Sequence, residues 1–275
     1  MPELPEVETI TRELAPRLTG RRIRRAELRK TDVLRRVSKA RLLKTLARNT
    51  VVSVGRRAKH AVFGLRSGHR LVIQPRMTGS LVVYDRPLTE DEDRYAVLQC
   101  TLDDGRRFVY RDVRRLGTVW LLDDRGWAAY TGRLGPEPLE DAFTAAAFAA
   151  RLRGTRAAVK KAIMDQRRVV GVGNIYANEA LFDARLDPSR PTHTLDTDDL
   201  THLHAAIRDV LRRAIASSGT TVRDYRTGTG ESGSFQFELK VYDRAGEPCR
   251  GCGRRLATTH AIDGRQTTFC YACQV

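Results

Sequence analysis

The sequence lacks any apolar run that approaches the roughly 20 residues needed to span a bilayer. Its first six residues include two glutamates and two prolines, where a secretory signal would carry basic and then apolar residues. We therefore expect neither a membrane span nor a signal peptide, and we predict a cytoplasmic protein.

Acidic residues are scarce relative to basic ones. The 275 residues include 33 Asp and Glu against 49 Lys and Arg, which gives a formal net charge of +16. Such an excess favours a polyanionic partner, and nucleic acid is the first candidate. A soluble basic protein without such a partner remains the alternative on charge alone. The hydrophobic fraction of 41% is sufficient for a buried core.

Cysteine is also scarce, but four of the five cysteines lie in the last 27 residues. Cys249-x2-Cys252 is followed after 17 residues by Cys270-x2-Cys273. Two such pairs can close a tetrahedron of thiolates around one Zn²⁺, whereas two disulfides are disfavoured in the cytosol. A closed four-cysteine site has no open position for substrate, so we predict a structural zinc. Cys100 stands alone, and we expect it to be buried in a strand.

Hydrophobic patterning divides the chain into three parts. Val7, Ile10, Leu14 and Leu18 predict a helix over residues 3–18, and short β-rich runs with a turn at Asp104-Gly105 fill residues 22–122. Beyond a Gly-Pro linker, helical patterns cover 141–153, 156–166, 175–184 and 197–215. Residues 217–234 are rich in Gly, Ser and Thr, which predicts a loop.

We therefore expect a multi-domain α+β protein. The predicted domains are a β-sandwich with an N-terminal helix (1–134), a helical domain with the 217–234 loop (135–234) and a zinc finger (235–275).

The N-terminus has unusual chemistry if Met1 is removed. Pro2 would then carry a secondary amine with a pKa of about 7.7–8.0, against about 10.4 for lysine, so roughly a tenth would be unprotonated and nucleophilic at neutral pH. Glu3, next to that amine, could move protons. The alternative is an ordinary helix start with proline and acids in its first turn, and chemistry alone favours this alternative.

A series of motifs favours the nucleophile instead. They are Pro2-Glu3-Leu4-Pro5-Glu6, Arg57-Ala58-Lys59, Arg76-Met77-Thr78-Gly79, Asp112-Val113-Arg114-Arg115-Leu116-Gly117, Leu134-Gly135-Pro136, Val159-Lys160, Asp165-Gln166, Gly171-Val172-Gly173-Asn174-Ile175-Tyr176, Ser234-Phe235-Gln236 and the cysteine tail. In this order, along the whole chain, they resemble the formamidopyrimidine-DNA glycosylase branch of the Fpg/Nei family. The Nei branch typically has glycine where this chain has Leu4.

The resemblance implies a bifunctional DNA glycosylase and AP lyase that excises oxidised purines from double-stranded DNA and cleaves abasic sites. It makes Pro2 the nucleophile, Glu3 the acid/base and Glu6 a supporting carboxylate. It also makes Lys59 the proton donor for β-elimination and Arg265 the donor for δ-elimination. The Gly171–Asn174 region corresponds to the family's helix–two-turn–helix element, in which a helix N-terminus binds phosphate.

The resemblance also implies a set of DNA contacts. Met77 would fill the space left by the flipped base, Arg114 would face the orphaned cytosine, and Leu116 stands where the family usually has a phenylalanine wedge. The remaining predicted contacts are Lys160, Asn174, Tyr176, Arg223, Tyr225 and Arg265, of which Arg223 and Tyr225 lie in a lesion-capping loop at 217–234. We expect a monomer.

Three alternatives remain at this point. One is the same chemistry on oxidised pyrimidines, as in the Nei branch. A second is a non-catalytic DNA-binding protein on the same scaffold, which the presence of Pro2, Glu3 and Lys59 disfavours. A third, a zinc-ribbon protein of RNA or the ribosome, explains the charge and the cysteines but not the N-terminal motif.

Overall fold

The computed structural model describes residues 2–221 and 225–275, which divide into two compact units. The first unit comprises the chain up to Gly132 together with Ser217–Gln236, and the second comprises Arg133–Ala216 and Phe237–Val275. The predicted domains placed residues 217–234 with the helical part, whereas the structure groups this segment with the N-terminal unit. Over the described ranges, none of the helices combines the length and the apolar character needed to cross a membrane.

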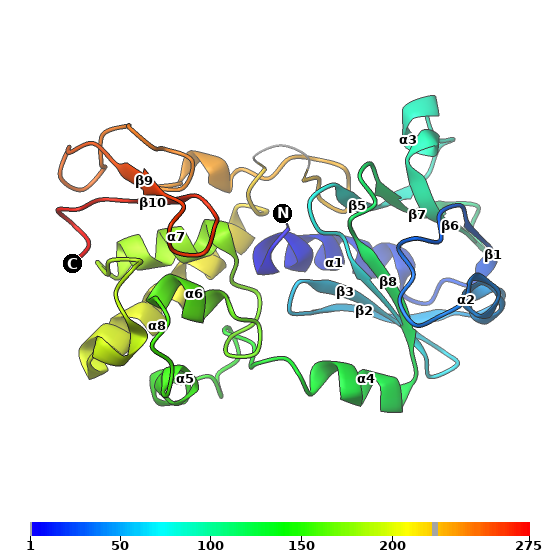
Figure 1. Ribbon diagram of the computed structural model, residues 1–275. Helices are drawn as coiled ribbons and strands as arrows, with labels where there is room; N and C mark the ends of the chain where they lie inside the picture. Colours follow the sequence, from blue (N-terminus) through cyan, green and yellow to red (C-terminus); the bar gives the residue numbers. More distant parts are fainter. Residues whose placement is uncertain (1, 222–224) are drawn as a thin grey trace. The chain divides into compact units, whose positions relative to one another are not determined.

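The first unit is a β-sandwich with an N-terminal helix, as predicted (Figure 1). One sheet has the order β1-β6-β7-β5 and the other β2-β3-β4-β8, and all pairings within them are antiparallel. The elements are α1 (Leu4–Leu18), β1 (Ile23–Leu28), α2 (Lys39–Leu46), β2 (Val51–Arg57), β3 (His60–Leu65), β4 (Arg70–Gln74), β5 (Gly79–Tyr84), α3 (Glu90–Arg94), β6 (Ala96–Leu102), β7 (Arg107–Asp112), β8 (Thr118–Leu122) and α4 (Asp124–Thr131).

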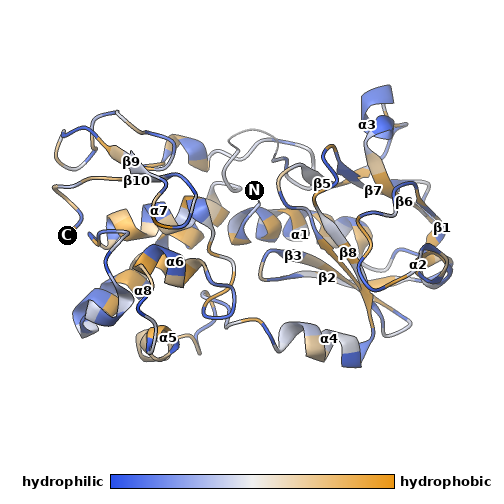
Figure 2. Ribbon diagram, viewed as in Figure 1, coloured by the Kyte–Doolittle hydropathy of each residue, from blue (hydrophilic) through white to orange (hydrophobic). Residues whose placement is uncertain are grey.

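One hydrophobic core joins α1 to both sheets. The predicted stripe Val7, Ile10, Leu14 and Leu18 is fully or almost fully buried in it, and so is Cys100 on β6. Burial raises the pKa of the Cys100 thiol to about 12, so this thiol is inert at neutral pH. By contrast, α3 consists of acidic and basic residues and is hydrophilic throughout (Figure 2).

The short helices α2 and α4 were not expected within and after the β-rich region. Each begins at a polar side chain that accepts from a main-chain amide of its first turn, Ser38 for α2 and Asp123 for α4. Leu42 and Leu46 of α2 are four residues apart and both buried. These caps were visible in the sequence, but each helix has only 8 residues, too few for a clear periodic pattern.

The second unit is helical and ends in a small hairpin. Its elements are α5 (Ala145–Leu152), α6 (Val159–Met164), α7 (Asn174–Asp183), a 3-10 turn (Thr192–Thr194), α8 (Thr197–Ala216), β9 (Ala257–Thr259) and β10 (Thr267–Phe269). A second 3-10 turn, Phe235–Phe237, spans the boundary at which the chain passes from the first unit back to the second. β9 and β10 pair in antiparallel fashion, between the two cysteine pairs. A separate apolar cluster containing Val241, Leu256 and two of the cysteines forms the core of this end of the unit.

Candidate active site, DNA-contacting residues and metal centre

Pro2 and Glu3 lie at the N-terminal end of α1, and Glu3 is the N-cap residue. The first turn of α1 carries Glu6, which is 1% exposed. Its Oε2 accepts a hydrogen bond from the Glu3 main-chain N–H at 2.7 Å, and its Oε1 accepts one from the Thr220 main-chain N–H at 2.8 Å. The Glu6 carboxylate therefore holds the main chain beside Pro2 and binds the 217–236 segment at the same time.

The 217–236 segment packs on α1. Gly219 has φ +81°, and a Cβ there would meet Glu6 at 3.0 Å, so this position suits glycine. Tyr225, a predicted DNA contact, is only 5% exposed, and its hydroxyl donates to the Ser218 carbonyl at 3.1 Å. Burial, and then the nearby Glu6, raise the pKa of the Tyr225 hydroxyl. Tyr225 thus supports the segment, while Arg223, the other predicted contact here, lies outside the described residues.

Lys59 is carried by the tight turn between β2 and β3 and is 5% exposed. Ala58, just before it, has φ +53°, a conformation that costs a residue with a side chain about 1–2 kcal/mol. The Arg56 guanidinium donates to the Ala58 carbonyl at 3.0 Å and to Glu8 of α1 at 2.9 Å. Despite the opposing effect of burial, the hydrogen bonds from Arg56 and Arg12 hold the pKa of Glu8 below its usual value. Glu8 and Arg56, absent from the predicted site, thus fix the turn that carries Lys59.

Arg114 and Leu116 lie on the loop between β7 and β8, which is organised by the buried carboxylate of Asp112. Its two oxygens accept from the Arg115 N–H at 3.0 Å and the Gly117 N–H at 2.8 Å. The Thr78 hydroxyl, next to Met77, also donates to Asp112, at 2.5 Å, and accepts from the Arg114 N–H at 3.1 Å.

The Asp112 carboxylate therefore joins the loop of Arg114 and Leu116 to the loop of Met77. Met77 is 46% exposed, Arg114 is exposed and Leu116 is half-buried. Asp112 opens a motif noted in the sequence, but its structural role was not anticipated. An aspartate followed by a tight turn is a known signal for such side-chain to main-chain bonds.

In the second unit, α7 begins at Asn174, directly after Gly173. Asn174 is half-buried, and its side-chain amide donates to the Gln266 carbonyl at 3.0 Å. Gln166 organises the preceding turn, because its Oε1 accepts from the Gly171 N–H at 2.9 Å and its amide donates to the Val172 carbonyl. Tyr176 has no exposed surface, so its ring belongs to the core of this unit.

Lys160 is fully buried, which differs from its predicted role in gripping phosphate. Its ammonium donates to Thr267 Oγ1 at 2.7 Å and lies 3.6 Å from the Asp263 carboxylate. In this conformation the Lys160 ammonium binds the β9–β10 hairpin through Thr267, and the buried side chain has no surface at which a phosphate could bind. The neighbouring Lys161 is exposed.

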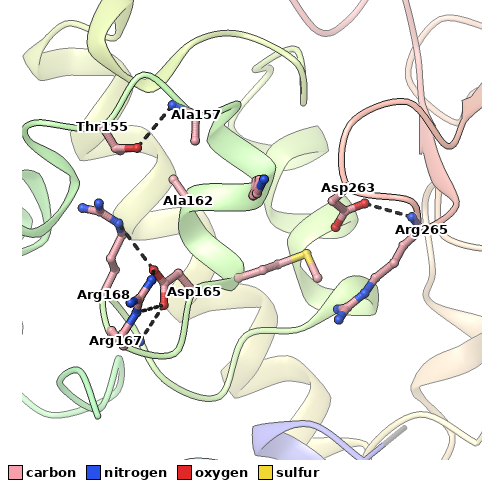
Figure 3. A pocket seen from close by; sticks show the side chains of 10 residues that line it. Thr155, Ala157, Ala162, Asp165, Arg167, Arg168, Asp263 and Arg265 are labelled. Atoms are coloured by element: carbon pink, nitrogen blue, oxygen red, sulfur yellow. Dashed lines mark hydrogen bonds and ion pairs between the residues drawn. The ribbon is translucent and has the colours of Figure 1, made fainter. Parts of the chain in front are cut away.

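Arg265 is exposed, and its main-chain N–H donates to Asp263 Oδ1 at 3.1 Å (Figure 3). It borders a pocket of about 490 Å³ that is also lined by Lys161, Arg167 and Arg168. Figure 3 shows Arg167 and Arg168 paired with Asp165, on the opposite side of the pocket from Arg265. The cationic groups around this pocket can bind a phosphate. Among the described residues that line it, Lys161 and Arg265 are exposed and are not neutralised by a carboxylate side chain.

The four cysteines of the tail converge. Their sulfur atoms all lie within 4.8 Å of one another, with Cys249–Cys273 at 3.9 Å and Cys252–Cys270 at 3.5 Å. Tetrahedral thiolates about 2.3 Å from a zinc ion would be about 3.8 Å apart, so the spacing fits such an ion. The Gly251 N–H donates to Cys249 Sγ at 3.3 Å. This cluster can hold a metal ion.

Comparison with known proteins places the chain in a family. The model of the formamidopyrimidine-DNA glycosylase N-terminal domain matches residues 1–119, and that of the formamidopyrimidine-DNA glycosylase H2TH domain matches residues 134–226. The formamidopyrimidine-DNA glycosylase of Chloroflexus aggregans is 43% identical, over 100% of this chain and 99% of the relative. That of Laribacter hongkongensis is 43% identical over 100% of both chains.

Solved structures agree. The MutM (Fpg) protein of Thermus thermophilus has a TM-score of 0.87 at 36% identity, covering 99% of this chain and 98% of that one. Lactococcus lactis Fpg in complex with DNA containing an abasic site has a TM-score of 0.90 at 32% identity and covers 99% of each chain. The sandwich, the helical unit and the cysteine hairpin are thus those of a DNA-repair glycosylase. The chain belongs to the formamidopyrimidine-DNA glycosylase family, as its motifs imply.

Proposed function

We propose that this protein is a bifunctional DNA glycosylase and AP lyase of base excision repair that excises oxidised purines. Membership of the family over the full chain supports the activity. The observation that carries the mechanism is Pro2 at the start of α1, directly followed by Glu3 and held there through Glu6. A mutant of Lactococcus lactis Fpg has been solved in complex with DNA containing Fapy-dG, which supports an oxidised-purine substrate for this chain.

The proposed reaction begins when the free amine of Pro2 attacks C1′ of the damaged nucleotide and the bond from C1′ to the base breaks. Opening of the sugar ring gives an iminium between Pro2 and C1′. Loss of a proton from C2′ then expels the 3′ phosphate, and loss of a proton from C4′ expels the 5′ phosphate. We assign acid/base transfer at the sugar to Glu3, the proton for β-elimination to Lys59 and the proton for δ-elimination to Arg265.

The damaged nucleotide must leave the helix before Pro2 can reach C1′, at a cost of a few kcal/mol in lost stacking. The exposed side chain of Met77 is suited to fill the space left behind, and Arg114 can face the orphaned cytosine. Leu116 is an apolar wedge on the same Asp112-organised loop. These three residues form the proposed interrogation surface.

For the phosphates we propose Arg265, Asn174 and Lys161. Lys160 and Tyr176 act through the structure that they support, because neither side chain has exposed surface. We further propose that the protein binds double-stranded DNA as a monomer in the cytoplasm. Its net charge of +16 supports the expectation that binding weakens steeply with salt.

The ion of the four-cysteine cluster is proposed to be a single structural Zn²⁺ held by Cys249, Cys252, Cys270 and Cys273. Zinc favours four thiolates in a tetrahedron, and four protein ligands leave no position for substrate. Elemental analysis of the purified protein should give one zinc per chain. A chelator that strips the metal should abolish DNA binding although Pro2 is intact, and added zinc should restore DNA binding.

The central test is trapping with borohydride, which reduces an iminium to a stable amine. Wild-type protein should become covalently attached to DNA with 8-oxoguanine opposite cytosine, and Pro2→Gly should not. No trapping by wild type, or full trapping by Pro2→Gly, would overturn the mechanism. Intact-mass measurement must also show Met1 removed, because an amide nitrogen cannot attack C1′. Comparison of 8-oxoguanine with thymine glycol separates this activity from that of the Nei branch.

A further inference from the structure

His60 follows Lys59 directly and is the first residue of β3. It is 8% exposed, and both of its ring nitrogens have partners. Nδ1 lies 3.2 Å from the Arg57 carbonyl and Nε2 lies 2.8 Å from the Tyr130 hydroxyl. A carbonyl can only accept, so Nδ1 carries the hydrogen, and in the neutral ring Nε2 accepts from Tyr130. The His60 ring therefore bonds back to Arg57, on the other side of the turn that carries Lys59, and connects this turn to Tyr130.

Tyr130 is the last but one residue of α4, and α4 contacts β8 of the sheet that contains β2 and β3. The Tyr130 ring packs 5.4 Å from Trp120 of β8 and stacks 6.2 Å from Trp127 of α4. The Arg70 guanidinium lies 5.5 Å over Trp127 and 2.6 Å from Asp124 at the start of the helix. The hydroxyl of Tyr130 thus reaches His60 from a ring that packs against two tryptophans.

The turn that carries Lys59 needs support from its surroundings. Ala58 is left-handed, and such a conformation persists only where its surroundings enforce it. Arg56 and Glu8 hold the turn from the side of α1, through the Ala58 carbonyl. His60 and Tyr130 hold it from the side of α4. Lys59, between Ala58 and His60, receives its main-chain position from both.

We propose that His60 and Tyr130 are positioning residues for Lys59, so that α4 sets the reach of this lysine into the reaction. The proposal rests on the proposed function, in which Lys59 delivers a proton. Burial, with smaller effects of the positive charges of Lys59 and Arg76, lowers the pKa of His60 to about 4, which keeps the ring neutral in the working range. A neutral ring adds no charge repulsion beside the Lys59 ammonium.

The test is a double-mutant cycle with Tyr130→Phe, which keeps the ring and removes only the hydroxyl. In single-turnover cleavage of DNA with 8-oxoguanine, Tyr130→Phe should be slowed roughly tenfold, because displacement of a catalytic group by a fraction of an ångström is costly. In a Lys59→Ala background the same change should alter the rate by less than about twofold. DNA affinity should not change. Tyr84→Phe, which removes a hydroxyl on β5 far along the chain from the turn, is the matched control.

Two results would overturn the proposal. One is an unchanged rate for Tyr130→Phe in the wild-type background. The other is the same fold-loss with and without Lys59, which would indicate a general structural effect. His60→Gln is the second variant if Tyr130→Phe unfolds early, and it should show the same dependence on Lys59. Wild-type protein run in parallel keeps the two hypotheses apart, since failure of wild type to cleave would contradict the proposed function instead.

Discussion

Glu6 Oε1 accepts a hydrogen bond from the Thr220 N–H at 2.8 Å while Glu6 Oε2 accepts one from the Glu3 N–H at 2.7 Å. One buried carboxylate thereby connects the residue after the proposed nucleophile to the segment that the family resemblance identifies as the lesion-capping loop. The state of that segment can therefore affect the position of Pro2.

From this connection we predict a selective defect in Glu6→Gln. An amide offers one acceptor oxygen, so one of the two N–H groups would face an NH₂, at a cost of about 1–3 kcal/mol. Excision of 8-oxoguanine should fall at least tenfold, whereas cleavage at a preformed abasic site, which has no base to cap, should fall much less. Single-turnover rates on the two substrates measure this.

The matched control is Glu13→Gln. Glu13 also accepts from the segment, from the Thr229 N–H at 3.0 Å, but from two turns further along α1. Its replacement should leave the ratio of the two rates near that of wild type. Equal losses on both substrates in Glu6→Gln would contradict a role in coupling the loop to the nucleophile.

Adjacent lysines of α6 provide a second prediction. Lys160→Ala removes the buried partner of Asp263 and Thr267, and breaking such a buried pair typically costs about 3–5 kcal/mol. We expect a lower unfolding temperature and faster loss of metal to a chelator. Lys161→Ala should leave both unchanged and instead reduce the slope of log K against log salt by about 0.9, one phosphate contact. The reverse pattern would restore Lys160 as the phosphate ligand.

The contrast between these lysines shows that the sequence did not predict which partners the side chains have in the folded protein. The α1 stripe, the β-rich region and the cysteine pairs were predictable because each is a local pattern. The partner of Lys160 is 107 residues away, in Thr267, and the partner of Glu6 is 214 residues away, in Thr220. A motif gives the type of residue at a position, but only the folded chain gives the direction of its side chain. For the same reason the sequence did not show that the rings of Tyr225 and Tyr176, both predicted as DNA contacts, are buried.

His60 leads to a prediction about pH. Its pKa is lowered to about 4 in the folded protein, from about 6.5 in an unfolded chain. Between these values the unfolded chain binds more protons, so the free energy of unfolding falls as the pH falls. The contribution is fully present above pH 6.5 and is lost on the way to pH 4, and it amounts to about 3 kcal/mol.

Denaturant unfolding at a series of pH values tests this directly. His60→Gln should be less stable than wild type near neutral pH, but the difference should shrink as the pH approaches 4. His193→Gln, at an exposed position of the second unit, should run parallel to wild type. A constant offset between His60→Gln and wild type across this range would show that His60 titrates normally in the folded protein.

Leu116 is the position at which this chain departs from the usual phenylalanine wedge, and it leads to the last prediction. Asp112 fixes the main chain on both sides of Leu116, so a larger side chain can be exchanged there without moving Arg114 or Met77. A leucine inserts between bases as an apolar wedge but cannot stack on them as an aromatic ring does, so we expect weak interrogation of intact pairs.

Leu116→Phe should therefore increase the ratio of kcat/KM for 8-oxoguanine·cytosine to kcat/KM for an undamaged duplex. An increase of about two- to twelvefold in this ratio would correspond to the 0.5–1.5 kcal/mol of an aromatic contact. Leu116→Ala should lower the same ratio, and a poorer ratio in Leu116→Phe would show that this loop is adapted to leucine.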